Sequence, residues 1–172
     1  PYSDVRAGGC PTLPFGLPAL DGLLPGRGLA FGALHEIVPE TGVAIPAALG
    51  FMAALLSRIP PSGPVLFITA PRGLAGCGRL HGHGLNALGL DPARVILVDA
   101  RDERQALWAM EESLRSGAPA AVAGAIGQGL DLKTSQRLQL AARSSGLPFL
   151  LLRPAAAAGT SAATTRWCID AA

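Results

Sequence analysis

The chain has 172 residues, 49% of them hydrophobic, and a formal net charge of +2 at pH 7. This length suits one domain with a sizeable core, and the low charge together with a positive mean hydropathy excludes a disordered chain. So small a charge gives no compositional support for nucleic-acid binding. The sequence has no apolar run of the ~18 residues that a membrane-spanning helix needs, so we expect no membrane contact.

Cysteine usage indicates a cytoplasmic protein. Cys10, Cys77 and Cys168 lie far apart, are odd in number and form no C-x-x-C pair. This pattern provides neither a disulfide framework nor a zinc site, and it is typical of a reducing compartment. The first residues show no signal-sequence pattern. They begin at Pro1 without a methionine, which suggests that an N-terminal piece has been removed.

The predicted elements begin with an N-terminal arm. Residues 1–16 contain Pro, Gly and Ser and few periodic apolar positions, so we expect an arm or loop there. We expect residues 17–172 to form a single core domain. Its first element is a short helix over residues 17–24, ended by the sequence Pro-Gly-Arg-Gly at residues 25–28.

Strands and helices then alternate through the core. The predicted strands are residues 33–38, 64–69, 95–99, 120–126 and 148–153, and the apolar runs of the second and third predict burial on both faces. The predicted helices are residues 46–58, 79–88, 103–115 and 132–144. Asp102 and Asp131 are placed to cap the last two helices, and Gly89 is placed as a C-terminal stop.

The last part of the chain is less regular. Residues 155–163 have low complexity and are predicted to form a loop. Residues 164–170 alternate like a further strand, for which an antiparallel direction is left open. The alternation of strand and helix predicts a doubly wound, mostly parallel α/β sheet with helices on both faces.

The loop after the first strand has the context of a phosphate-binding loop without its chemistry. A Walker A loop, G-x-x-x-x-G-K-[ST], places backbone N–H groups around the phosphates, a lysine on the β/γ-phosphates and a hydroxyl on Mg²⁺. The residues here have one glycine, no lysine and no following Ser or Thr. They are Glu40, Thr41, Gly42, Val43, Ala44 and Ile45. This combination predicts a scaffold or regulator built on an ATPase fold.

Several segments, taken in order, resemble known families. Residues 20–24 (LDGLL), Gly28-Leu29 and residues 32–37 (GALHEI) resemble the entry to the RecA core. Residues 89–117, with the wording ARDE…LWAMEE…LRS, are more similar to ImuA, the inducible-mutagenesis protein A family. Residues 137–153 and the closing TTRW are similar to it as well. The resemblance covers roughly residues 17–167 and implies a RecA-like form of the predicted sheet.

ImuA proteins are bacterial DNA-damage-response factors encoded with a polymerase-like partner, ImuB, and they support mutagenic translesion synthesis. The resemblance therefore implies an accessory role in the SOS response, through protein contacts with ImuB and with RecA. Single-stranded DNA is a weaker candidate partner, and self-association is left open. Members of the family tend to continue past the TRW segment with a basic tail, so we expect this chain to be a core that lacks a partner-binding element.

At three positions where an ATPase has a catalytic residue, this sequence has residues of another type. The phosphate loop has no lysine, and the second strand ends Thr69-Ala70-Pro71-Arg72 without the glutamate that would activate water. Residues 120–127 have no aspartate to support Mg²⁺. We therefore expect no hydrolysis and no cofactor. Weak nucleotide binding through backbone and helix-dipole contacts is an alternative.

Four arginines follow the second and third strands, where a doubly wound sheet carries its ligand crevice. They are Arg72, Arg79, Arg101 and Arg104. One interpretation is a patch that faces an anionic partner or DNA. The favoured one is solvated surface interleaved with the acidic residues at 99, 102 and 103. Trp108 and Trp167 are candidate contact residues, with core packing as the alternative for each.

The sequence patterns of a metal site, a zinc protease and a hydrolase are each present only in part. His81 and His83 have no nearby Cys or carboxylate to complete a metal site, so an exposed loop is favoured. His35-Glu36 lacks the second histidine of H-E-x-x-H, and Glu36 is expected to end its strand. Ser144, Ser145 and Ser161 lack the G-x-S-x-G elbow of a hydrolase. As an alternative function, the same ATPase-deficient core is found in SulA-like cell-division inhibitors that bind FtsZ.

Overall fold

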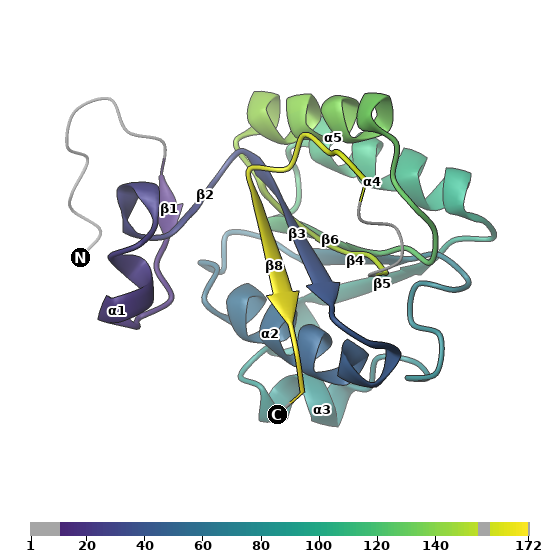
Figure 1. Cartoon of the computed structure of the whole chain (residues 1–172), viewed down its shortest axis with the longest axis horizontal. Helices are drawn as coiled ribbons and strands as arrows, with labels where there is room; N and C mark the ends of the chain where they lie inside the picture. Colours follow the sequence, from purple (N-terminus) through teal and green to yellow (C-terminus); the bar gives the residue numbers. More distant parts are fainter. Residues whose placement is uncertain (1–10, 155–158, 172) are drawn as a thin grey trace.

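The computed structural model describes residues 11–154 and 159–171 (Figure 1). Residues 1–10, from the predicted arm, and residues 155–158, from the predicted low-complexity loop, lie outside the described residues. Within residues 11–16, β1 (Thr12–Leu13) pairs antiparallel with β2 (Leu29–Ala30). The side chains of Leu13 and Phe15 are buried, so this stretch packs into the core.

Six strands form one parallel sheet. Their order is β5-β4-β6-β7-β3-β8, and all five neighbouring pairs are parallel. The strands are β3 (Ala33–Pro39), β4 (Val65–Thr69), β5 (Val95–Asp99), β6 (Ala121–Ala125), β7 (Pro148–Leu152) and β8 (Thr165–Ile169). A parallel sheet flanked by helices is confirmed, and every predicted strand is present.

The antiparallel alternative for the last strand is wrong, because β8 runs parallel to β3. After β7 the chain returns to the amino edge of the sheet before it enters β8, and strands joined by such a crossover are parallel. Hydrogen bonds between the two chain segments mark both ends of this pairing. Thr164 N donates to Leu34 O, and Glu40 N donates to Ile169 O, both over 2.8 Å.

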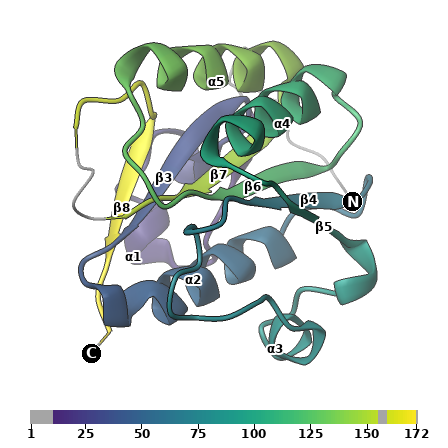
Figure 2. The same ribbon diagram turned by 90° about the vertical axis from the view of Figure 1, so that its right-hand side faces the viewer.

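Two helix layers cover the two faces of the sheet (Figure 2). α2 (Ile45–Ser57) and the short α3 (Gly82–Ala87) lie on one face, and α4 (Glu103–Ser116) and α5 (Leu132–Ser145) lie on the other. The predicted caps are confirmed, since Asp102 accepts from Gln105 N and Asp131 from Thr134 N, both at 2.7 Å. The other elements are α1 (Pro18–Asp21) and 3-10 turns at Pro25–Arg27, Gly42–Ala44 and Pro92–Arg94.

α3 is shorter than the helix predicted over residues 79–88. Gly76 and Gly78 have φ angles of +84° and +73°, so the chain before α3 is a series of turns. Gly89, with φ +81°, stands just past the C-terminal end of α3, as predicted for a stop. The glycine-rich sequence therefore limits the helix from both sides.

Each helix layer encloses its own apolar core. On β3, Ile37 lies in the core under α2 and Leu34 in the core under α4 and α5, as the alternation of a strand requires. On the α4 side, helix and sheet approach so closely that a Cβ on Gly124 would lie 2.2 Å from Met110 Cε. This contact explains why β6 has a glycine at its centre.

β5 is not the doubly buried strand that its sequence predicts. It lies at the edge of the sheet next to β4, and the side chains of Ile96 and Leu97 are 49% and 45% exposed. The apolar run VILVD is a strand signal, but the position of a strand in the sheet depends on the crossovers that precede and follow it. The prediction of burial on both faces is therefore wrong for β5.

Candidate functional site

The loops at the carboxyl edge of the sheet form the candidate site. After β4 the chain leads to α3 on one face, whereas after the neighbouring β6 it leads to α5 on the other face. Neighbouring strands whose following helices diverge in this way leave a crevice outside their carboxyl ends. Open α/β sheets bind ligands in such a crevice.

The loop that joins β3 to α2, residues 40–44, is a tight turn at this edge, and Ile45 is the first residue of α2. Its centre, Gly42–Ala44, is a 3-10 turn in which Ala44 N donates to Thr41 O over 3.1 Å, and α2 begins directly after it. Gly42 does not have a positive φ, and a Cβ there would meet no atom within 4 Å. The turn therefore makes no use of the backbone freedom for which phosphate loops contain glycine.

The larger hollow at this edge lies beyond β4 and β5. It has a volume of about 580 Å³, and Arg79 and Arg101 contribute to its lining together with Leu97. Arg79 forms an ion pair with Asp99, which also accepts a hydrogen bond from Thr69 Oγ1 over 2.9 Å. The structure therefore brings two of the four predicted arginines together, and one of them is paired with an acidic neighbour.

A smaller hollow of about 210 Å³ lies beside it, beyond β3, β6 and β7. Arg72 and Arg153 line it, and Arg72 is exposed whereas Arg153 is buried. Glu103 of α4 also approaches this hollow, because its carboxylate accepts from Gly127 N over 2.7 Å. Arg104, the fourth predicted arginine, is exposed on α4 and lines neither hollow.

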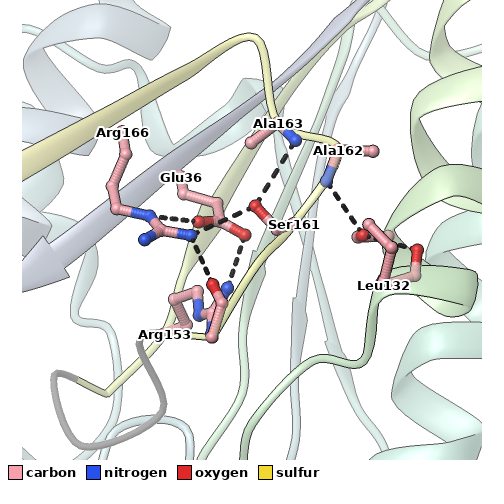
Figure 3. A network of polar contacts seen from close by, with 9 residues as sticks. Glu36, Leu132, Arg153, Ser161, Ala162, Ala163 and Arg166 are labelled. Atoms are coloured by element: carbon pink, nitrogen blue, oxygen red, sulfur yellow. Dashed lines mark hydrogen bonds and ion pairs between the residues drawn. The ribbon is translucent and has the colours of Figure 1, made fainter.

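A buried carboxylate that sequence reasoning missed lies at the centre of β3. Glu36 has no solvent-exposed side-chain surface, and it accepts from Arg153 Nη1 over 2.6 Å and from Arg166 Nε over 2.8 Å (Figure 3). Arg153 is equally buried, whereas Arg166 is 33% exposed. The prediction that Glu36 ends its strand is therefore wrong, because β3 continues to Pro39. Glu36 joins β3 to β8 and to the residue that follows β7.

The same network fixes the chain that enters β8. Arg166 Nη2 donates to Gly159 O over 2.9 Å and to Ser161 Oγ over 3.2 Å. Ala162 N donates over 3.0 Å to Ser135 Oγ, a fully buried hydroxyl of α5. The segment before β8 is thus tied to α5 at one point and to β3 through Arg166 at another. No local sequence pattern indicated these contacts, because Glu36 and Arg166 are 130 residues apart.

His35 and Thr165 form a second connection between β3 and β8. Trp167 Nε1 donates to Thr165 Oγ1, which bonds His35 Nδ1, and His35 Nε2 bonds Ala30 O, at 2.8 to 2.9 Å. A carbonyl only accepts, so Nε2 carries the proton and Nδ1 accepts from the Thr165 hydroxyl. Burial lowers the pKa of His35, with the Ala30 bond opposing it, and this favours the neutral ring.

The two tryptophans have different surroundings. Trp167 is half-buried, and its ring packs against Phe15 and Phe51 at centroid distances of 5.1 and 5.6 Å. Trp108, on the outer side of α4, is 59% exposed. Core packing therefore accounts for Trp167, whereas Trp108 remains a candidate contact residue. Glu111, a buried residue of the same helix, forms ion pairs with Arg115 of α4 and with Arg137 of α5. The pair with Arg137 joins the two helices.

Among the described residues, the histidine and serine signals are not completed into a metal site or a hydrolase site. The rings of His81 and His83 stack 5.1 Å apart, and no group of three metal-binding side chains is present among the described residues. Ser145 Oγ donates to carbonyls of its own helix, and Ser161 Oγ accepts from Arg166. None of the described helices is long and apolar enough to cross a membrane.

No protein-family model matches the sequence. The crystal structure of SulA from Pseudomonas aeruginosa is similar with a TM-score of 0.50 and 24% identity, covering 70% of this chain and 97% of that chain, which shows a shared fold.

Curated relatives named Protein ImuA, from two strains of Caulobacter vibrioides, are 39% identical over 144 residues, or 79% of this chain and 54% of theirs. The chain therefore spans about half the length of the curated relatives it matches. The matched region extends over most of the chain, as the resemblance of its segments predicts. The chain belongs to the ImuA family.

Proposed function

We propose that this chain is the core of a non-catalytic accessory factor in bacterial DNA-damage-induced mutagenesis. The observation that carries the proposal is its 39% identity to Protein ImuA. The factor acts through protein contacts, first with the polymerase-like ImuB and second with RecA. A RecA-like surface that does not switch with ATP is suited to cap or perturb a RecA filament.

The carboxyl edge supports a non-catalytic role. The loop after β3 is a tight turn without lysine, and the only lysine of the chain, Lys133, belongs to α5. The segments after β4 and β6 carry no carboxylate at the positions where an ATPase would need one. Glu103, which approaches the end of β6, is engaged by a backbone N–H.

Binding to ImuB tests the proposed role. Because the matched relatives are about twice as long as the matched region, the assay compares this chain with a full-length relative, each against immobilised ImuB and RecA. We expect the full-length protein to retain ImuB, and retention by this chain would assign the contact to the α/β core. A full-length protein that retains neither partner would overturn the proposal.

Weak nucleotide binding is a second candidate, and one observation favours it. Arg153 is buried beside the smaller hollow, and its Nε and Nη2 have no hydrogen-bond partner in the described part of the chain. Thermal unfolding with and without 1 mM Mg-ATP decides this point. A site with a Kd of ~10 µM would add roughly 2.7 kcal/mol and raise Tm by about 5–10 °C. We expect no shift.

The cell-division alternative shares the fold with SulA, and a fold does not specify a partner. Co-sedimentation with FtsZ polymers distinguishes the SulA-like function from the ImuA-like function. Retention of the chain by FtsZ without retention by ImuB would favour the SulA-like function.

A further inference from the structure

β5 has no lysine, proline or bulge, and its single charged side chain, Asp99, lies at its carboxyl end. Natural edge strands are blocked by lysine, proline, a bulge or a covering segment, because their free N–H and C=O groups are a template for another strand. β5 reads VILVD and pairs with β4 in continuous register along its whole length. Among the described residues, no strand lies on its other side.

The open side of β5 is apolar on both faces of the sheet. Val98 packs in the core under α4, so Ile96, two residues earlier, lies on that face, and Leu97 lies on the opposite face. Both side chains are close to half exposed. A strand added beside β5 would cover the two of them at once.

One hydrogen bond fixes the direction of the backbone groups. Ala100 N donates to Thr69 O at the end of β4 over 2.9 Å. Backbone groups of successive strand residues point to opposite sides, so those of Ile96 and Val98 point toward β4 as well. The N–H and C=O groups of the remaining three residues therefore point outward. These are Val95, Leu97 and Asp99.

We propose that two copies of this chain pair through β5, antiparallel, about a two-fold axis beside Leu97. The outward residues are spaced symmetrically about Leu97, so Leu97 faces the partner's Leu97 and Val95 faces the partner's Asp99. Each of these pairs exchanges two N–H···O bonds. The same operation places Ile96 beside the partner's Val98, so exposed apolar side chains cover one another.

A second copy of this chain is a matching partner for the strand. A two-fold contact uses the same surface on both copies, and β5 meets this condition in its backbone groups and in its apolar side chains. Asp99 does not oppose the pairing, because Arg79 and Thr69 already hold its carboxylate. The two six-stranded sheets become one continuous sheet.

Analytical ultracentrifugation over a range of concentrations tests the pairing. We expect a species of twice the chain mass of 17.5 kDa. Leu97→Pro removes an outward N–H and leaves the bonds to β4 in place, so it should preserve the circular dichroism spectrum and weaken association at least tenfold. Leu140→Ser, at a position on α5 that is 64% exposed, is the matched control and should leave association unchanged. A monomer at every concentration, or equal effects of both variants, would overturn the proposal.

Disulfide cross-linking provides a second measurement with the fold intact. In a background with serine at positions 10, 77 and 168, Leu97→Cys places two Cα atoms ~5.5 Å apart across the axis, within the range of a disulfide. Ile96→Cys is the control, because its own copy lies diagonally at ~7–8 Å. We expect several-fold more cross-linked dimer for Leu97→Cys. Equal yields would contradict a closed two-fold pair. Neither result depends on ImuB, so the proposed function is tested separately.

Discussion

The sheet ends in β8 on one side and in β5 on the other, and the two strands are held by different forces. β8 is joined to β3 by the buried Glu36 carboxylate and by the His35–Thr165 hydrogen bond, and Trp167 packs β8 against Phe15. β5 has backbone pairing with β4 and an exposed ion pair between Arg79 and Asp99. The side chains that β8 exposes are Arg166 and Cys168, whereas β5 exposes the apolar Ile96 and Leu97 beside Asp99.

An edge strand is therefore either fixed to the rest of the fold by side-chain contacts or left free to pair with another strand. A buried charge must meet its partner, so Glu36 allows one register and one neighbour for β8. Apolar side chains and free backbone groups accept any matching strand, so β5 is open to association. The predictions below change one edge at a time.

The largest effect is expected at Glu36. Glu36→Gln keeps the size of the side chain but leaves the charge of Arg153 buried without a counter-ion. Removing one partner of a buried ion pair costs about 3–5 kcal/mol. Urea unfolding should show this loss in the free energy of unfolding. A loss below 1 kcal/mol would mean that the network does not hold the β8 edge.

Trp167→Ala removes the ring that joins β8 to Phe15 and Phe51. Full burial of such a ring would give a cost of 3–5 kcal/mol, and half-burial lowers the expectation to about 2 kcal/mol. Trp108→Ala, at the exposed position on α4, is the control and should change the free energy of unfolding by less than about 0.5 kcal/mol. Similar losses for both variants would show that Trp167 has no special part in fixing β8.

The pH dependence of stability tests the His35 connection. Because burial lowers the pKa of His35 below 6.5, the unfolded chain binds the proton first as the pH falls. The free energy of unfolding should therefore be fully retained above pH 6.5 and fall below it, by at most about 1.4 kcal/mol per pH unit. Unfolding measured between pH 5.5 and 7.5 should show this slope in the parent and in His81→Gln, an exposed control. His35→Gln should remove it, and a slope that persists there would assign the effect elsewhere.

The smallest effect is expected at the ion pair on the β5 edge. Asp99→Asn removes the carboxylate charge from a pair whose side chains are 80% and 56% exposed. Exposed pairs contribute about 0–1 kcal/mol, and salt screens them, so the loss should shrink further in 1 M NaCl. A loss equal to that of Glu36→Gln would remove the distinction between the two edges.

Much of the secondary structure could be predicted because its signals are local. The caps at Asp102 and Asp131 and the stop at Gly89 each depend on a few neighbouring residues, and all three are present. The candidate site was predicted less completely. The arginines do follow the carboxyl ends of β4 and β5, but only the folded chain shows that Arg79 and Arg101 share one hollow while Arg104 lies apart.

The strands and helices, the family resemblance and the lack of lysine in the loop after β3 can all be read from neighbouring residues. The edge position of β5, the parallel direction of β8 and the burial of Glu36 between Arg153 and Arg166 appear only in the folded chain. The two groups of features differ in the distance along the chain over which their contacts act. A cap or a strand is stabilised by residues a few positions apart, whereas Glu36 meets arginines 117 and 130 positions away, in contacts that form only when the sheet is complete.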